Sequence, residues 1–300
     1  MRKDTESGQA LVLILLSLSV VLTIVLFVMS RSITDIAIST EQADSVRAFS
    51  AAEAGVENAL ITGAGSGGSV TIGDASYSVD VTNYSENLPT FNYPVPLLSG
   101  DSMTNWFVAH NSTGGITCAA GFACFTGNTL KLCWGNSGTP ASGSTTPAAE
   151  ISVYYETTPG SLSTIQVARA AFDPNVSRAA SNYFTGVDAG TCQIDGVSYA
   201  FQKTITMSGL GIPAGSYNVS NGLIFAKVKM LYNTDIGHIV GISANFAGDT
   251  TLPSQGINIV STGVSGTTGS LSNRRVSVFR GWHEFPLSGL AVFYPYGISK

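Results

Sequence analysis

Residues 10–29 form a run of twenty residues without a charged side chain, interrupted only by two serines and a threonine. Twenty residues of α-helix span about 30 Å, which matches the hydrocarbon core of a lipid bilayer. A charged side chain at the bilayer centre costs a few kcal/mol, so a charge-free run of this length is seldom accidental. We therefore predict a transmembrane helix from Ala10 to Met29.

A buried core helix and a cleaved secretory signal fit this apolar run less well. A buried core helix rarely contains more than about 14 consecutive apolar residues. A secretory signal would use Arg2 and Lys3 as its basic segment, but the run is long for a signal. In addition, residues 30–32 do not form a clear cleavage site. The membrane anchor is the better interpretation.

The charges that flank the run predict its orientation. Arg2 and Lys3 precede it, whereas Arg31 follows it. Because positively charged residues favour the cytoplasmic side, we expect a cytoplasmic N-terminus and an extracytoplasmic remainder. The chain would then be a single-pass protein of the inner, or cytoplasmic, membrane, with membrane lipid around its helix.

The helical pattern continues beyond the membrane. Residues 30–60 contain no proline, and their first glycine is Gly55. Apolar or small residues recur there at spacings of three, four and seven, which is typical of one stripe along a helix. This predicted contact stripe consists of Ile33, Ile36, Ala43, Val46, Phe49, Ala52, Val56 and Ala59. The glycine-rich residues 63–68 end the pattern, so residues 7–60 predict one helix about 80 Å long.

Two segments of this helix resemble a known family. Residues 6–12, ESGQALV, and residues 48–56, AFSAAEAGV, resemble the N-terminal region of PilX-type minor pilins, within the type IV pilin and pseudopilin superfamily. The resemblance covers about 55 of the 300 residues. It implies a long helix that is held in the membrane before assembly and packs its outer half against a β-sheet head. It also implies cleavage by a prepilin peptidase after Gly8, which would leave Gln9 first.

The same resemblance implies partners and a place in the assembly. The partners would be other pilin-like subunits and the pilus assembly machinery, and an assembled subunit would lie at the cell surface. Major pilins carry a glutamate five residues after the cut, whereas this chain has Leu13 at that position. This departure favours a minor subunit over the main subunit of the fibre.

From Val70 onward the pattern is that of β-strands. Polar and apolar residues alternate at 77–82, 151–155, 201–205, 224–232 and 276–278, as in half-buried strands. We therefore predict an α+β fold, in which the long helix packs on an antiparallel sheet formed by residues near 70–83 and 255–282. The expected divisions are a leader-like cytoplasmic segment 1–8, a helix 9–62, a linker 63–69 and a β-rich extracytoplasmic head 70–300. Within the head, residues of about 90–250 would form a large inserted β subdomain.

The four cysteines, all in this insertion, predict disulfides. Cys118, Cys124, Cys133 and Cys192 are even in number and lie in the part of the chain that is expected outside the cytoplasm. Three pairings are possible. The spacing favours a local Cys118–Cys124 loop together with a Cys133–Cys192 bridge between strands. Four thiolates without a C-x2-C pair or a nearby histidine make a zinc site the weaker alternative.

Composition and motifs exclude several function classes. Only 11% of the residues are charged and the net charge is −5, so the chain lacks the basic surface of a nucleic-acid-binding protein. The three histidines, His110, His238 and His283, are far apart in the sequence and have no metal-ligand spacing. We predict no catalytic residues, no metal and no cofactor. Three aromatic residues, Trp134, Tyr154 and Trp282, could form a binding face, although core packing is the more common role.

These features favour a structural subunit over an enzyme. The expected function is that of a PilX-like minor pilin, an assembly subunit of a type IV pilus or a related secretion system. The alternative is a membrane-anchored surface adhesin or binding module, whose β-rich head would bind a surface ligand.

Overall fold

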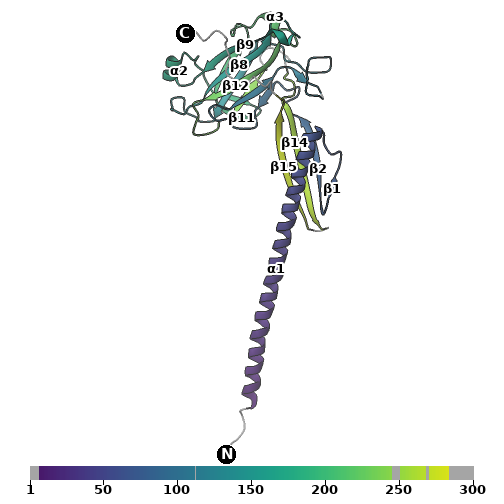
Figure 1. Ribbon diagram of the computed structural model, residues 1–300. Coiled ribbons are helices and arrows are strands. Elements are labelled where there is room, and N and C mark those ends of the chain that lie inside the picture. The colour runs from purple at the N-terminus through teal and green to yellow at the C-terminus, as the bar shows by residue number, and fades with distance from the viewer. Residues whose placement is uncertain (1–6, 112, 245–250, 268–269, 284–300) are drawn as a thin grey trace, which may run out of the picture. The chain divides into compact units, whose positions relative to one another are not determined.

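The computed structural model describes residues 7–111, 113–244, 251–267 and 270–283 (Figure 1). The chain divides into two compact units. Unit 1 is drawn from Met1–Val81 and Ile259–Val278, and unit 2 from Thr82–Asn258 and Phe279–Lys300. Unit 1 combines a long helix with an antiparallel sheet and unit 2 is almost entirely β-structure, so the predicted α+β class is confirmed. Residues 1–6 of the expected leader and the tail 284–300 lie outside the described residues.

Helix α1 (Ser7–Thr62) is continuous over 56 residues. It contains no proline, and it ends where Gly63 adopts a left-handed backbone with a φ of 69°. The amide of Gly63 donates a hydrogen bond to the carbonyl of Ala59 at 2.8 Å, which satisfies one of the last free carbonyls of the helix. The C-terminal half of α1 lies along a sheet, whereas its N-terminal half extends beyond that sheet (Figure 1).

The sheet of unit 1 has four strands in the order β1-β2-β14-β15. Their bounds are Val70–Ile72, Ala75–Asn83, Gly256–Thr267 and Ser270–Gly281, respectively. On β2, Tyr77 and Val79 are buried while Ser78 and Asp80 are exposed, so the predicted alternation is confirmed. The glycine-rich segment before β1 is partly held against this sheet, because the Ser66 amide donates to the Val79 carbonyl at 3.0 Å.

Helix α1 packs on this sheet through its smallest residues. Buried alanines and a glycine of the helix recur at spacings of three and four, and they are Ala48, Ala51, Ala52, Gly55 and Ala59. A Cβ atom on Gly263 of β14 would overlap the carbonyl oxygen of Ala48, and one on Gly55 would overlap Ser261, Tyr77 and Val79. The helix backbone therefore lies directly on the strand, at a separation that larger side chains would prevent.

Unit 2 is a sandwich of two antiparallel sheets. The first sheet has the order β10-β11-β7-β13-β3 and the second has the order β4-β12-β8-β9. The first contains β10 (Cys192–Ile194), β11 (Val197–Thr206), β7 (Thr129–Asn136), β13 (Val240–Ser243) and β3 (Thr90–Asn92). The second contains β4 (Ser102–Trp106), β12 (Leu223–Leu231), β8 (Ala148–Glu156) and β9 (Ile165–Phe172). One apolar core joins the two sheets, with Leu132 and Ile242 from the first and Ile151 and Met230 from the second.

Small elements connect these strands. They are β5 (Ala109–His110), β6 (Ile116–Thr117), a 3-10 helix (Leu162–Thr164), α2 (Val176–Asn182) and α3 (Ala214–Tyr217). Helix α2 is held by the buried Asp173, which receives hydrogen bonds from the Arg178 guanidinium at 2.6 and 2.8 Å. The same guanidinium lies over the ring of Tyr232, with Cζ 3.9 Å from its centroid.

A β-bulge in β12 changes which residues face the core. The sequence alternation predicts Ile224, Ala226 and Val228 on one face. The register of β12 against β8 shifts between Leu223 and Phe225, so Leu223 faces the sandwich core with Ala226 and Val228. Ile224 instead packs with Phe225 and Trp106 in a separate apolar cluster. The prediction for Ile224 is wrong because one extra residue in the strand reverses the alternation.

The close packing of α1 on β14 predicts a strong effect of a single methyl group. In Gly263→Ala the new methyl must displace α1, which we expect to cost about 1–3 kcal/mol. Proteolytic cleavage between residues 44 and 59 of the full-length chain should then be about 5- to 150-fold faster, because that free energy sets the population of opened helix. Gly68→Ala is the matched control, because no atom lies within 4 Å of its Cβ position. Equal cleavage of the two variants would contradict the packing.

Candidate functional site: the N-terminal helix

From Ala10 to Met29, the surface of α1 is almost entirely apolar and carries no charge. Within the described residues, α1 is the one helix long and apolar enough to cross a membrane, and none of its most apolar window is buried by the protein. Its polar side chains are satisfied internally, since the hydroxyls of Ser17, Ser19 and Thr23 donate to carbonyls three residues earlier at 2.8–2.9 Å. No polar group of Ala10–Met29 therefore requires water or a partner, as a bilayer demands. Gly8 and Gln9, the predicted cleavage pair, lie in the first turn of the helix.

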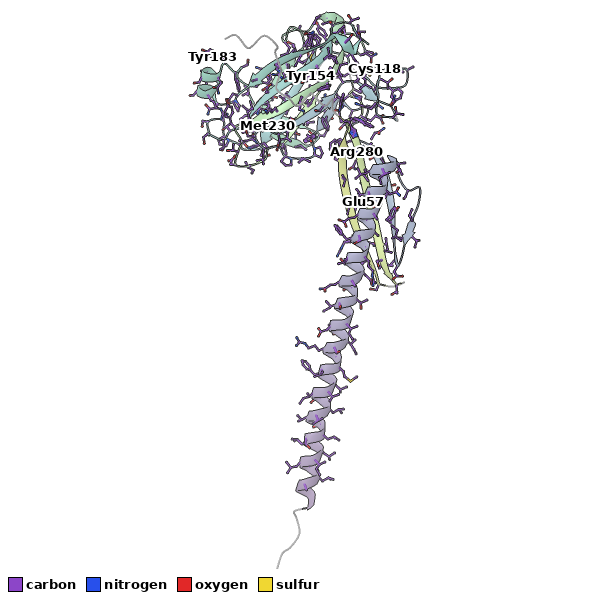
Figure 2. All side chains as sticks on the ribbon, viewed as in Figure 1. Glu57, Cys118, Tyr154, Tyr183, Met230 and Arg280 are labelled. Carbon is purple, nitrogen blue, oxygen red and sulfur yellow. A yellow bond between two sulfur atoms is a disulfide. The ribbon has the colours of Figure 1, made fainter. Side chains whose placement is uncertain are left out.

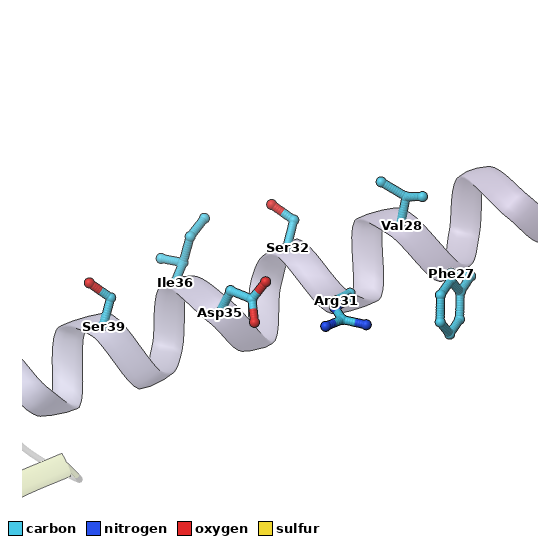
Figure 3. Close-up of a pocket in the computed structure, with 7 residues that line it drawn as sticks. All are labelled: Phe27, Val28, Arg31, Ser32, Asp35, Ile36 and Ser39. Carbon is cyan, nitrogen blue, oxygen red and sulfur yellow. The ribbon is translucent and has the colours of Figure 1, made fainter.

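A charged zone follows the apolar run. A shallow hollow on one face of α1 is lined by Phe27, Val28, Arg31, Ser32, Asp35, Ile36 and Ser39 (Figure 3). All seven residues belong to the same helix, so the hollow is a depression between side chains and encloses no ligand-sized space. Among the described residues Arg31 and Asp35 form no ion pair, whereas Asp44 and Arg47 pair at 3.2 Å. The hollow marks the boundary at which the helix surface becomes amphipathic.

The structure divides the predicted contact stripe into two groups. Ala52, Val56 and Ala59 are buried against the sheet of unit 1. The other five are exposed; Ile33, Ile36, Val46 and Phe49 are between 45% and 66% exposed, and Ala43 is also exposed. Figure 2 shows that side chains project on all sides of α1 where it extends beyond the sheet. We call Ile33, Ile36, Val46 and Phe49 the uncovered stripe.

The spacing of the residues explains this division. An α-helix turns about 100° per residue, so each spacing of three falls about 60° short of a full turn. Three such steps and one of seven lead from Ile33 to Phe49, so the apolar residues wind part of the way around the helix. The sheet contacts only one side of the helix. The hydrogen bonds from the sheet that lie nearest the N-terminus of α1 go from Ser265 to Asp44, at 3.2 Å, and from Arg274 to Ser45, at 2.6–2.9 Å.

Three residues that make the intramolecular contact lie outside the predicted stripe. Ala48, Ala51 and Gly55 are buried, yet the prediction omitted them because it followed a single line of residues along the helix through Phe49. A repeat of alanine and glycine at spacings of three and four was the signal that could have found them. Small residues of this kind allow a helix backbone to approach another backbone closely.

No protein-family model matches this sequence, no curated protein matches it, and no solved structure matches its fold. The candidate site therefore rests on the geometry of α1. The described chain belongs to a simple structural class: a long apolar helix whose C-terminal half packs on an antiparallel sheet, followed along the chain by a β-sandwich unit.

The disulfides predicted in unit 2 are confirmed. Cys118 pairs with Cys124, and Cys133 pairs with Cys192, which is the pairing that the spacing favoured. The first disulfide joins two cysteines that are six residues apart in the sequence and closes a loop beside β6. The second joins β7 to β10 within the five-stranded sheet. The described residues contain no free cysteine and no cluster of His, Cys, Asp or Glu that could hold a metal.

The three candidate aromatic residues do not form a common face. Trp134 is fully buried in the sandwich core, and its Nε1–H donates to the Pro147 carbonyl at 2.9 Å. Tyr154 is partly buried and stacks on Phe225, with ring centroids 4.3 Å apart. Trp282 stacks instead on His110, at 4.8 Å and 12°. All three serve packing within unit 2.

His110 occupies an apolar site between two indole rings. Its ring stands edge-on to Trp106 at 4.4 Å and is stacked with Trp282, leaving the residue only 9% exposed. Its Nδ1 atom has no hydrogen-bond partner among the described residues. Burial, and secondarily the nearby His283, lowers the pKa of His110 to about 4. The imidazole is therefore neutral in the folded protein at ordinary pH.

This environment predicts a loss of stability in mild acid. An unfolded His110 takes up a proton near pH 6.5, whereas the folded one does so near its pKa of about 4. The free energy of unfolding should therefore fall as the pH drops from about 6.5 to about 4, and this part of the dependence should be absent in His110→Phe. Burial also lowers the pKa of His238, so the difference between the two proteins isolates His110. The free energy of unfolding of both proteins can be measured by denaturant titration at pH 7 and at pH 4.5. An equal change between the two pH values in the unaltered protein and in His110→Phe would contradict the lowered pKa of His110.

Proposed function

We propose that this chain is a membrane-anchored structural subunit that assembles through α1 with other pilin-like subunits. The supporting observation is the uncovered stripe. It lies beyond the membrane-length run, and four large apolar side chains there contact no part of the described chain closely enough to be buried. Burying each of them is worth about 1.5–3 kcal/mol, which strongly favours a lateral partner over exposure to water.

The length of the intervening helix supports the same proposal. Between Met29 and Asp44, where the sheet begins to cover α1, the helix makes about four turns, or about 21 Å. A simple tether needs only a flexible segment of polar residues. A rigid helix with exposed isoleucines is suited to side-by-side packing with other helices, in which apolar side chains interlock.

The apolar run suits both a membrane and an assembly. A helix with apolar side chains all around it can lie in lipid or in the core of a helical bundle, because both surroundings are apolar. We therefore propose that the bilayer holds the subunit before assembly, with its N-terminus in the cytoplasm and both β-structured units outside. On assembly the same surface would leave lipid for contact with other helices. Together with the resemblance of residues 6–12 and 48–56, this favours a minor pilin of a type IV pilus or of a related secretion system.

A polar substitution in the uncovered stripe tests this proposal. The polymer can be sheared from the surface of cells and collected by high-speed sedimentation. Ile36→Asn should lower its amount at least about tenfold, since the substitution removes buried apolar area from the lateral contact. The amount of chain in the membrane fraction should not change, because Ile36 is exposed in the single subunit. Ser39→Asn, an exposed neighbour on the same helix, is the control. Full polymer recovery with Ile36→Asn would refute assembly through this stripe.

A second prediction concerns maturation at the N-terminus. If the chain is processed as the resemblance implies, mass spectrometry of the membrane-extracted protein should find Gln9 as its first residue. Gly8→Leu should retain Met1, because a bulky side chain replaces the small residue before the cut, whereas Ser7→Ala should be processed normally. Detection of intact Met1 in the unaltered chain, in cells that contain an active prepilin peptidase, would count heavily against a processed subunit.

A further inference from the structure

Helix α1 carries a second exposed surface on the side turned away from its sheet. Phe49, Glu53 and Glu57 are exposed and follow one another at spacings of four, so they line one side of the helix. The described residues provide no ion-pair partner for either glutamate. We call this surface the acidic strip. A complementary partner surface would have an apolar side chain opposite Phe49 and a basic side chain opposite the glutamates.

The outer face of strand β15 has that composition. Arg274 hydrogen-bonds to Ser45 of α1, so its side chain lies on the helix side of the sheet. Successive side chains of a strand alternate between faces, so Leu271 and Arg275 lie on the opposite, outer face. Leu271 is 59% exposed, and Arg275 is exposed and forms no ion pair with any described residue. We call Leu271 and Arg275 the basic patch.

The two surfaces match in length and direction. Phe49 and Glu57 are eight helical residues apart, or about 12 Å, and Leu271 and Arg275 are four strand residues apart, or about 13 Å. Contacts of β14 with α1 run from Ser265 at Asp44 to Ser261 at Gly55, so β14 is antiparallel to the helix and β15 is parallel to it. Phe49 can therefore pack on Leu271 while Glu57 pairs with Arg275.

We infer that the acidic strip of one subunit docks on the basic patch of a second copy of the same chain. Both halves of the contact belong to unit 1, and they are complementary in charge and in the order of their apolar and charged side chains. They are different surfaces, so the contact is head-to-tail, and each copy keeps one free half for the next. This inference rests on the proposed assembly function and specifies one of its contacts.

The docking also predicts an axial shift between copies. Arg275 lies next to Arg274, which is level with Ser45 of its own helix. In the contact, Arg275 would be level with Glu57 of the neighbouring copy, which is twelve helix residues beyond Ser45. Successive copies would therefore be displaced by about 18 Å along the helix axis. This staggered arrangement extends as an open fibre and does not close into a symmetric dimer.

Site-directed crosslinking of the full-length chain in membranes tests the contact. Two differently tagged copies carry Glu57→Cys and Arg275→Cys, and a short bis-maleimide joins them; the described native cysteines are all in disulfides and do not react. Asn58→Cys with Arg275→Cys is the matched control, because Asn58 is exposed but lies about 100° around the helix from Glu57. The first pair should give at least about ten times more heterodimer. Equal yields, or no heterodimer from the first pair, would overturn the inference.

Charge exchange provides an independent readout. Glu57→Arg and Arg275→Glu, each expressed alone, should lower the co-purification of two differently tagged copies of the chain at least about tenfold, because like charges then meet. Co-expression of the two variants should restore it, since the copy with Glu57→Arg then meets an opposite charge on the copy with Arg275→Glu. Loss without restoration would count against the pairing. If Ile36→Asn abolishes the polymer but the crosslink and the exchange both fail, the docking is wrong and assembly through the uncovered stripe stands. If the unaltered chain forms no polymer, the assembly function itself fails.

Discussion

The close approach of α1 to strand β14 is the contact on which the geometry of unit 1 depends. Ala48 and Ala52 of the helix lie on Gly263 of the strand, and Gly55 lies on Ser261, Tyr77 and Val79. Because Gly263 and the two alanines that it faces have no bulky side chain, the helix backbone packs directly on the strand along one narrow side. That contact decides which side of α1 faces the sheet, and therefore which apolar residues of the helix remain available to other molecules.

The remaining surface of α1 changes in character along the chain. The first twenty apolar residues are self-sufficient in hydrogen bonding, the next stretch is amphipathic without cover, and the last part is half buried by the sheet. A helix with these three sections can pass from a bilayer into an assembly with little change in its surroundings. The uncovered stripe and the acidic strip are exposed in a single subunit for the same reason: the sheet is too narrow and too short to cover more than one side of the helix.

Unit 2 is stabilised in a different way. Its core joins two antiparallel sheets, and its disulfides cross-link the segments around β7 and β10 and around β6. Many polar groups inside it are hydrogen-bonded to the backbone. The Arg178 guanidinium donates to the carbonyls of Ser144 and Thr146, and the Gln255 amide both accepts from and donates to the backbone of Trp106. His110 and Asn105 are among the exceptions: the Nδ1 atom of His110, buried between indole rings, and both amide atoms of Asn105 have no hydrogen-bond partner among the described residues.

Much of this arrangement was predictable from the sequence, because it depends on local patterns. The charge-free run and the absence of proline determine a long helix, the alternation of side chains determines the strands of β2, β8 and β11, and cysteine spacing favoured the observed pairing. The tertiary structure decided what depends on contacts distant in sequence. Gly263 lies more than two hundred residues after Ala48, so the local repeat of small residues on α1 does not show which strand they face. Likewise, the bulge in β12 reverses the facing of Ile224. The fold also buries His110 between Trp106 and Trp282, near His283, which lowers its pKa. Periodicity specifies which elements form, whereas close packing between distant segments specifies which of their faces are buried.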